Sequence, residues 1–150
     1  MTMDEVFEKH ARRIRGIEGA SPEEIAELER LVGHPLPKEL RAYYLRAGRN
    51  PGNLHFVQTH KIVEPSIAES IKFHRPRRHG RHAAPVRNKI FFADGGTCQD
   101  CGPAFLALEV PSKLPKLAID PDDPPVIGMD YDDPVLLAAT FTEYVRSAFP

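Results

Sequence analysis

Residues 21–48, SPEEIAELERLVGHPLPKELRAYYLRAG, contain two helix starts and two helix ends. Ser21 and Glu24 have the spacing of a capping box, in which each side chain bonds the backbone N–H of the other residue. Gly33 and the two prolines that follow it end the first helix, because a proline cannot donate to the helical ladder. A second helix begins at Pro37 and runs to the end of the stretch. We therefore predict two amphipathic helices in succession.

Two further helices are predicted, one towards each end of the chain. Asp4–Ile17 places apolar side chains at positions i, i+4 and i+7, which form one helical face. In the C-terminal part, Asp133 can cap a helix whose first position is Pro134. That helix would bury apolar side chains at helical spacing, namely Leu137, Phe141, Tyr144 and Val145.

The middle of the chain is typical of strands. Leu54–Val63 favours β structure, whereas Glu64–Phe73 is compatible with either a short helix or a bulged strand. His74–Asn88 has five arginines and no apolar periodicity, which indicates a solvated loop. Strands with clear boundaries are predicted at Lys89–Ala93, Ala104–Val110, Lys116–Ile119 and Pro125–Asp130. The first two of these strands would pair as a hairpin.

The length and composition are those of one folded domain. The chain has 150 residues, of which 41% are apolar and 27% are charged. It shows no internal repeat and no linker, so we predict a single domain over residues 1–150. No apolar run is long enough to cross a membrane, and the acidic N-terminus is unlike a signal peptide. Two cysteines with two residues between them favour a reducing compartment, and we expect a cytoplasmic protein.

The net charge of −1 hides an uneven distribution. Residues 1–90 contain 17 lysines and arginines against 11 acidic residues, whereas residues 91–150 contain 3 against 10. A chain without a basic excess is a poor general ligand of nucleic acid, and the arginine-rich loop has no Phe, Tyr or Trp to stack on bases. Nucleic acid is therefore not the expected partner.

Four stretches taken together resemble the SUKH superfamily, the relatives of the yeast cell-wall-assembly regulator and of many bacterial immunity proteins. They are residues 19–25 (GASPEEI) with Leu28 and Glu29, residues 36–45 (LPKELRAYYL), residues 90–96 (IFFADGG), and Asp133-Pro134 with residues 141–145 (FTEYV). The resemblance extends over almost the whole chain. It implies an α+β fold with a largely antiparallel sheet flanked by helices.

The resemblance also implies a function. Members of this superfamily act by binding other proteins, and in bacteria the usual role is to neutralise a cognate toxin. A regulatory or scaffolding interaction, as in the fungal relatives, is the alternative. The superfamily offers no catalytic residues to carry over, and the sequence has no glycine-rich phosphate loop, nucleophile elbow or His-Glu-x-x-His motif. We therefore expect a non-enzymatic protein that requires no cofactor.

Cys98 and Cys101, with a glycine directly after them, have the spacing of a zinc knuckle. His79 and His82 form a second pair with the same spacing, and fifteen residues separate them from Cys98. The four side chains could hold one structural zinc ion that pins the arginine-rich loop. The alternative is two free thiols in a hairpin and two histidines among arginines, whose positive field opposes a cation. Both segments depart from the usual pattern of the superfamily.

Six aspartates are the candidate partner-binding residues: Asp120, Asp122, Asp123, Asp130, Asp132 and Asp133. They lie on two proline-bounded turns that we expect to converge at one edge of the sheet. Many toxins that act on nucleic acids have basic clefts, so an acidic surface would speed association and compete with the toxin's substrate. The alternatives are ordinary turn chemistry, which aspartate and proline both favour, and calcium binding, for which the regular ligand spacing is missing.

Overall fold

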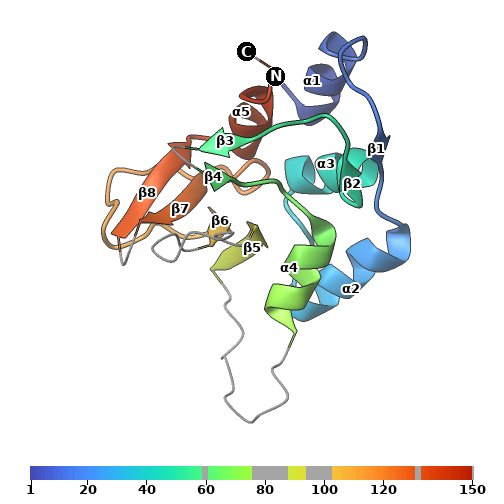
Figure 1. Ribbon diagram of the computed structural model, residues 1–150. Coiled ribbons are helices and arrows are strands. Elements are labelled where there is room, and N and C mark those ends of the chain that lie inside the picture. The colour runs from blue at the N-terminus through green and yellow to red at the C-terminus, as the bar shows by residue number, and fades with distance from the viewer. Residues whose placement is uncertain (59–60, 76–87, 94–102, 131–132, 150) are drawn as a thin grey trace.

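The computed structural model describes residues 1–58, 61–75, 88–93, 103–130 and 133–149 (Figure 1). In these residues the helices are α1 (Met3–Lys9), α2 (Pro22–Val32), α3 (Lys38–Ala47), α4 (Ile67–His74) and α5 (Phe141–Arg146). The short strands are β1 (Ile17–Glu18), β2 (Asn50–Pro51), β3 (Val57–Gln58) and β4 (Lys61–Ile62). The longer strands are β5 (Lys89–Ala93), β6 (Ala104–Ala107), β7 (Val126–Asp130) and β8 (Asp133–Ala138).

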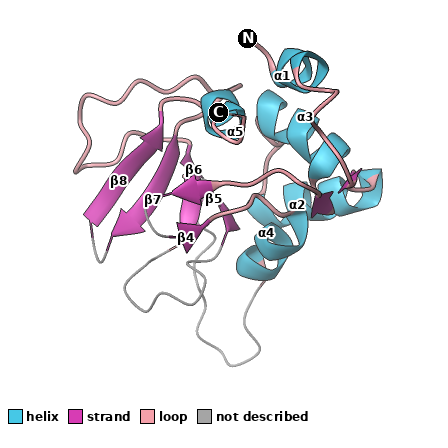
Figure 2. Cartoon of the chain, turned by 45° about the horizontal axis from the view of Figure 1, so that its top comes forward, coloured by secondary structure: helices cyan, strands magenta, loops and turns pink. Residues whose placement is uncertain are grey.

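Strands β5, β6, β7 and β8 form one sheet in that order, with every neighbouring pair antiparallel. We call it the main sheet. Strands β1 and β2 form one small antiparallel pair, and β3 and β4 form another. Figure 2 shows helices α1 to α4 gathered to one side of the main sheet. The fold is therefore α+β with an antiparallel sheet, as the sequence predicted.

The helix pair predicted from residues 21–48 is confirmed. The Ser21 hydroxyl accepts from the Glu24 N–H at 3.2 Å, and the Glu24 carboxylate accepts from the Ser21 N–H at 3.1 Å. Gly33 ends α2 in the left-handed conformation, with a φ of 83°. Glycine adopts this conformation at little cost in free energy because it has no side chain. Helix α3 follows directly after Pro37 and ends before Gly48. Glu64–Phe73, which the sequence left open between a helix and a bulged strand, is helical from Ile67, and helix α4 continues to His74.

The prediction of one helix over Asp4–Ile17 is wrong in its C-terminal half. Helix α1 ends at Lys9, and Ile17 lies in β1, where it pairs with Pro51. The chain can run this close to residues 50–53 because Gly16 and Gly52 both have positive φ, and a Cβ on Gly52 would lie 2.1 Å from the Arg15 carbonyl oxygen. Pairing between distant segments therefore replaces the second half of the predicted helix.

The predicted helix start at Asp133-Pro134 is also wrong. Both residues lie in β8, where Asp133 pairs with Asp130 across a two-residue connection. Pro134 is tolerated because β8 is an edge strand of the main sheet. The last helix begins later, and the Thr140 hydroxyl caps it by accepting from the Glu143 N–H at 3.1 Å. Phe141, Tyr144 and Val145 are buried in this helix as predicted, whereas Leu137 belongs to the strand.

Two strand predictions also need correction. Lys116–Ile119 forms turn and loop, with the Leu117 N–H donating to the Leu114 carbonyl. The strand predicted over Ala104–Val110 ends at Ala107, where the chain leaves the sheet. The prediction for Lys89–Ala93 is confirmed with both boundaries, and its antiparallel pairing with Ala104–Ala107 is also confirmed.

The core lies between the helices and one face of the main sheet, which we call the core face. Its sheet side consists of Ile90, Phe92, Leu106 and Val126, and helices α2 to α5 contribute Ile25, Leu28, Leu40, Ile67 and Phe141. Three buried tyrosines lie at its centre, where Tyr43 packs edge-on against Phe141 and Tyr144 stacks on Phe56. Burial raises the pKa of Tyr44 well above its ordinary value, so its hydroxyl stays protonated and able to donate.

The tyrosine hydroxyls hold the connection between β4 and α4, residues 63–66. The Tyr144 hydroxyl donates to the Val63 carbonyl at 2.5 Å, and the Tyr43 hydroxyl donates to the Pro65 carbonyl at 3.4 Å. Val63 is 1% exposed, so water cannot replace the first of these bonds. The hydrogen bonds therefore satisfy carbonyls that would otherwise be buried without a partner.

We predict that Tyr144→Phe lowers the free energy of unfolding by about 1–3 kcal/mol, because it leaves the buried Val63 carbonyl without its donor. Tyr43→Phe is the matched control, since its hydroxyl bond is longer and should contribute less. Urea denaturation of both variants measures the difference. Equal losses in the two variants would contradict the role given to the Tyr144 bond.

Candidate binding site on the outer face of the main sheet

The main sheet has a second face, opposite the core face, that carries its own apolar cluster. Side chains alternate across a strand, so Phe91, Phe105, Ala107 and Ile127 lie on the face opposite the core face. We call this the outer face. In the described chain it is covered by Leu114 and Leu117, which lie on the segment 109–117 after β6, and by the Phe73 ring, which stacks on Phe91 at 3.9 Å.

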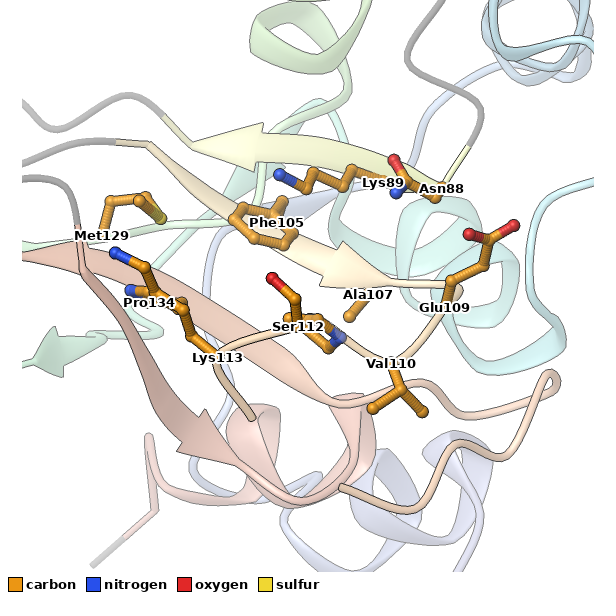
Figure 3. A pocket seen from close by; sticks show the side chains of 11 residues that line it. Asn88, Lys89, Phe105, Ala107, Glu109, Val110, Ser112, Lys113, Met129 and Pro134 are labelled. Atoms are coloured by element: carbon orange, nitrogen blue, oxygen red, sulfur yellow. The ribbon is translucent and has the colours of Figure 1, made fainter. Parts of the chain in front are cut away.

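A cavity of about 420 Å³ lies between the outer face and the segment 109–117 (Figure 3). Phe105, Ala107, Met129 and Pro134 supply its apolar side from three neighbouring strands. Residues 109–113 form the opposite wall, and Figure 3 shows Val110 and Glu109 on that side. The cavity therefore combines apolar sheet residues with a polar and charged rim.

Lys89, Lys113 and Glu109 are the charged residues that line the cavity. The Lys89 ammonium lies 4.7 Å from the centre of the Phe105 ring, which is a cation–π contact. Lys113 donates to the Asp133 carboxylate at 3.0 Å. Among the described residues no carboxylate forms an ion pair with Lys89, which is half-buried. Lys89 is thus a cation whose charge the described part of the chain leaves unneutralised.

A second, more apolar cavity of about 360 Å³ adjoins the same segment. It is lined by residues 113–117 and by Leu136 of β8. Leu136 is 43% exposed, and Val110, on the rim of the first cavity, is 48% exposed. These exposed apolar side chains, together with the two cavities, offer contact area to another protein.

Helix α4 covers the β5 edge of the main sheet. The Phe91 N–H donates to His74 Nε2 at 3.1 Å, and the Ser70 hydroxyl donates to the Phe91 carbonyl at 2.5 Å. The Ser66 N–H donates to the Phe92 carbonyl at 3.1 Å. His74 can accept this bond only in its neutral form. Burial, and secondarily the nearby His34, hold the pKa of His74 below its ordinary value.

The lowered pKa of His74 predicts a loss of stability in acid. A histidine whose pKa falls on folding contributes fully above its unfolded value of about 6.5, and the contribution is lost as the pH falls through the lowered value. His74→Gln keeps an acceptor but does not titrate, so its melting temperature should fall less between pH 7.5 and pH 5 than that of the unchanged protein. His55→Gln, at an exposed histidine, is the control. An equal fall in all three proteins would refute the assignment.

The candidate aspartates form two groups that β7 separates. Asp120, Asp122 and Asp123 precede the start of β7, whereas Asp130 and Asp133 lie at its far end. The expected convergence of the two turns is therefore wrong, because an extended strand connects them. Asp132 lies outside the described residues. The assignment of these aspartates to partner binding stays a prediction.

Asp120, Asp122 and Asp123 form hydrogen bonds within the fold that the sequence did not predict. Asp123 accepts from the Thr142 N–H at 2.9 Å, in the first turn of α5. The Asp122 carbonyl accepts from the Glu39 N–H at 3.0 Å, and the Asp120 carboxylate accepts from the Asp122 N–H at 2.9 Å. Asp122 is exposed, and these hydrogen bonds use its backbone groups and not its carboxylate. Its carboxylate can therefore face a partner.

The predicted zinc site lies outside the described residues. Cys98, Cys101, His79 and His82 all fall within residues 76–87 or 94–102. The part of the chain that is described contains no group of three or more histidine, cysteine, aspartate or glutamate side chains placed to hold a metal ion. Zinc binding by the four residues stays a prediction.

The outer-face cavity was not predicted from the sequence, although the composition of one strand indicated a second apolar surface. Strand β6 is AFLA, apolar at every position, and all four residues are buried. A strand that is apolar on both faces must be covered on both faces. That pattern could have indicated a second apolar cluster, but not the place of Lys89 or of the segment 109–117.

Comparison with known protein families matches residues 19–147 to the SMI1 / KNR4 family (SUKH-1). The match covers most of the chain, including α2, α3 and the whole main sheet. The chain therefore belongs to this family, which confirms the resemblance found in the sequence. No curated protein matches the chain. None of the described helices is long and apolar enough to span a bilayer.

Proposed function

We propose that the chain is a non-enzymatic protein-binding module whose role is to neutralise a cognate bacterial toxin. Membership of the SMI1 / KNR4 family carries this proposal, because binding of other proteins is what membership of the SUKH superfamily implies. The outer face supports it independently, since exposed apolar side chains there adjoin two cavities. The fold's own core does not need these side chains.

A protein that neutralises a toxin by binding needs a contact surface and no catalytic groups. The described residues offer apolar contact area on the outer face and exposed carboxylates at Asp122 and Asp130. The carboxylates add a long-range attraction for a basic toxin, which raises the rate of encounter. The apolar surface provides close contacts, which set the lifetime of the complex.

The proposal is tested by co-expression with a toxin encoded next to this gene. We expect the chain to restore growth of cells that produce the toxin and to co-purify with it as a stable complex. Unrestored growth with every neighbouring toxin, together with no complex, would refute the immunity role. A stable complex with a non-toxic neighbour would instead support the regulatory alternative.

We predict that Asp122→Lys and Asp130→Lys each slow association with the toxin about threefold or more at low salt, with dissociation changed less than about twofold. Glu8→Lys is the control, because it makes the same charge change at an exposed position of α1, in the basic half of the chain. Asp123 is unsuitable, since its reversal would break the bond to the Thr142 N–H. Surface plasmon resonance measures both rate constants. Equal association rates for all variants would contradict acidic steering.

A further inference from the structure

We infer that the outer-face cavity is the anchor site for a protein segment that presents a bulky apolar side chain with a carboxylate beside it. The apolar side chain enters between Phe105, Met129 and Pro134, and the carboxylate bonds the Lys89 ammonium. The inference rests on the proposed protein-binding function and names the chemistry of the segment that binds.

The residues that line the cavity indicate that the bound segment presents an apolar side chain. Phe105, Ala107 and Met129 point into it from neighbouring strands of one sheet, and Pro134 adds a rigid wall. The volume of about 420 Å³ lies within the range of cavities that take ligands, roughly 300–1,000 Å³. Side chains held by a sheet change little on binding, so an apolar group finds a largely preformed surface.

The position of Lys89 indicates that the bound segment also presents a carboxylate. Lys89 is half-buried and lies over the Phe105 ring, and no described carboxylate neutralises it. A partly buried ammonium beside a ring bonds an incoming carboxylate more strongly than a fully hydrated one would, because less water must be removed. A cationic side chain would instead be repelled by Lys89.

The anchor and the acidic carboxylates act at different distances. Asp122 precedes β7 and Asp130 is the last residue of that strand, and both are exposed to solvent. Their field reaches about 8–10 Å into solvent at physiological salt and affects the encounter. The anchor makes contact only after encounter and affects dissociation. A basic toxin can therefore carry one acidic and apolar segment that binds in the cavity.

The experiment is a selection of random twelve-residue peptides, displayed on phage, against the full chain. Selected peptides are synthesised with a fluorophore and titrated by fluorescence anisotropy. We expect the selected sequences to share a Phe, Leu, Ile or Met with an Asp or Glu within two positions. The amide form of each peptide, with Gln or Asn in place of the acid, should bind about tenfold more weakly.

Three variants of the chain locate the binding. Lys89→Gln should weaken peptide binding about tenfold, whereas Lys116→Gln, the same change at an exposed lysine of the second cavity, should change it less than about twofold. Val110→Asp removes apolar contact area from the cavity rim and adds a second carboxylate beside Glu109, so it should weaken peptide binding about tenfold. Val110 is exposed, so we expect this variant to keep the fold, and circular dichroism and the melting temperature are the measurements that check it.

Several results would overturn the inference. They are selected peptides without a carboxylate, peptides that bind Lys89→Gln or Val110→Asp as tightly as the unchanged chain, and a selection that enriches no sequence. Each outcome is independent of the toxin experiment. Peptide binding without growth rescue would leave the anchor in place and refute immunity, whereas rescue by Lys89→Gln and Val110→Asp at unchanged affinity would refute the anchor alone.

Discussion

The hydrogen bonds from three buried tyrosines are the constraint on which the rest of the structure depends. Residues 63–66 connect the short strand β4 to helix α4. Val63 and Pro65 in this connection are buried. Tyr144 and Tyr43 donate to the Val63 and Pro65 carbonyls, and Tyr44 lies 2.7 Å from the Ser70 hydroxyl in α4. These bonds fix where α4 begins and how it approaches the main sheet.

The position of α4 decides which surfaces of the sheet are available. Ser70, Ser66 and His74 bond backbone groups of Phe91 and Phe92, so α4 covers the middle of this edge against pairing with another strand. Helices α2 to α5 cover the core face. In the described chain the outer face is covered by the segment 109–117 and by the Phe73 and His74 rings of α4. A partner that binds this molecule through the sheet therefore meets the outer face and its cavity.

Local signals in the sequence predicted the parts of the fold that local interactions determine. The capping box at Ser21 and the left-handed Gly33 act within one helix, and both were predicted correctly. Asp133-Pro134 was misassigned because the same two residues suit a helix start and an edge strand, and only the pairing with β7 decides between them. The end of α1 was missed for a similar reason, since Ile17 pairs with Pro51 far along the chain.

The candidate site was harder to predict than the fold because no motif encodes it. Lys89, Met129 and Pro134 come from three strands, and only the order of the strands brings them together. Asp123 looked like a surface residue of an acidic turn, but its carboxylate caps the first turn of α5. Its role depends on a contact with Thr142, nineteen positions away, which no pattern of aspartates and prolines indicates.

The central claim is that this member of the SMI1 / KNR4 family binds its partner through the outer face of the main sheet. Hydrogen–deuterium exchange of the purified complex, read by mass spectrometry, tests it directly. The account predicts that binding slows exchange in residues 104–117 and leaves exchange in α1 to α3 unchanged. Slower exchange confined to α1, α2 or α3, with residues 104–117 unaffected, would contradict it.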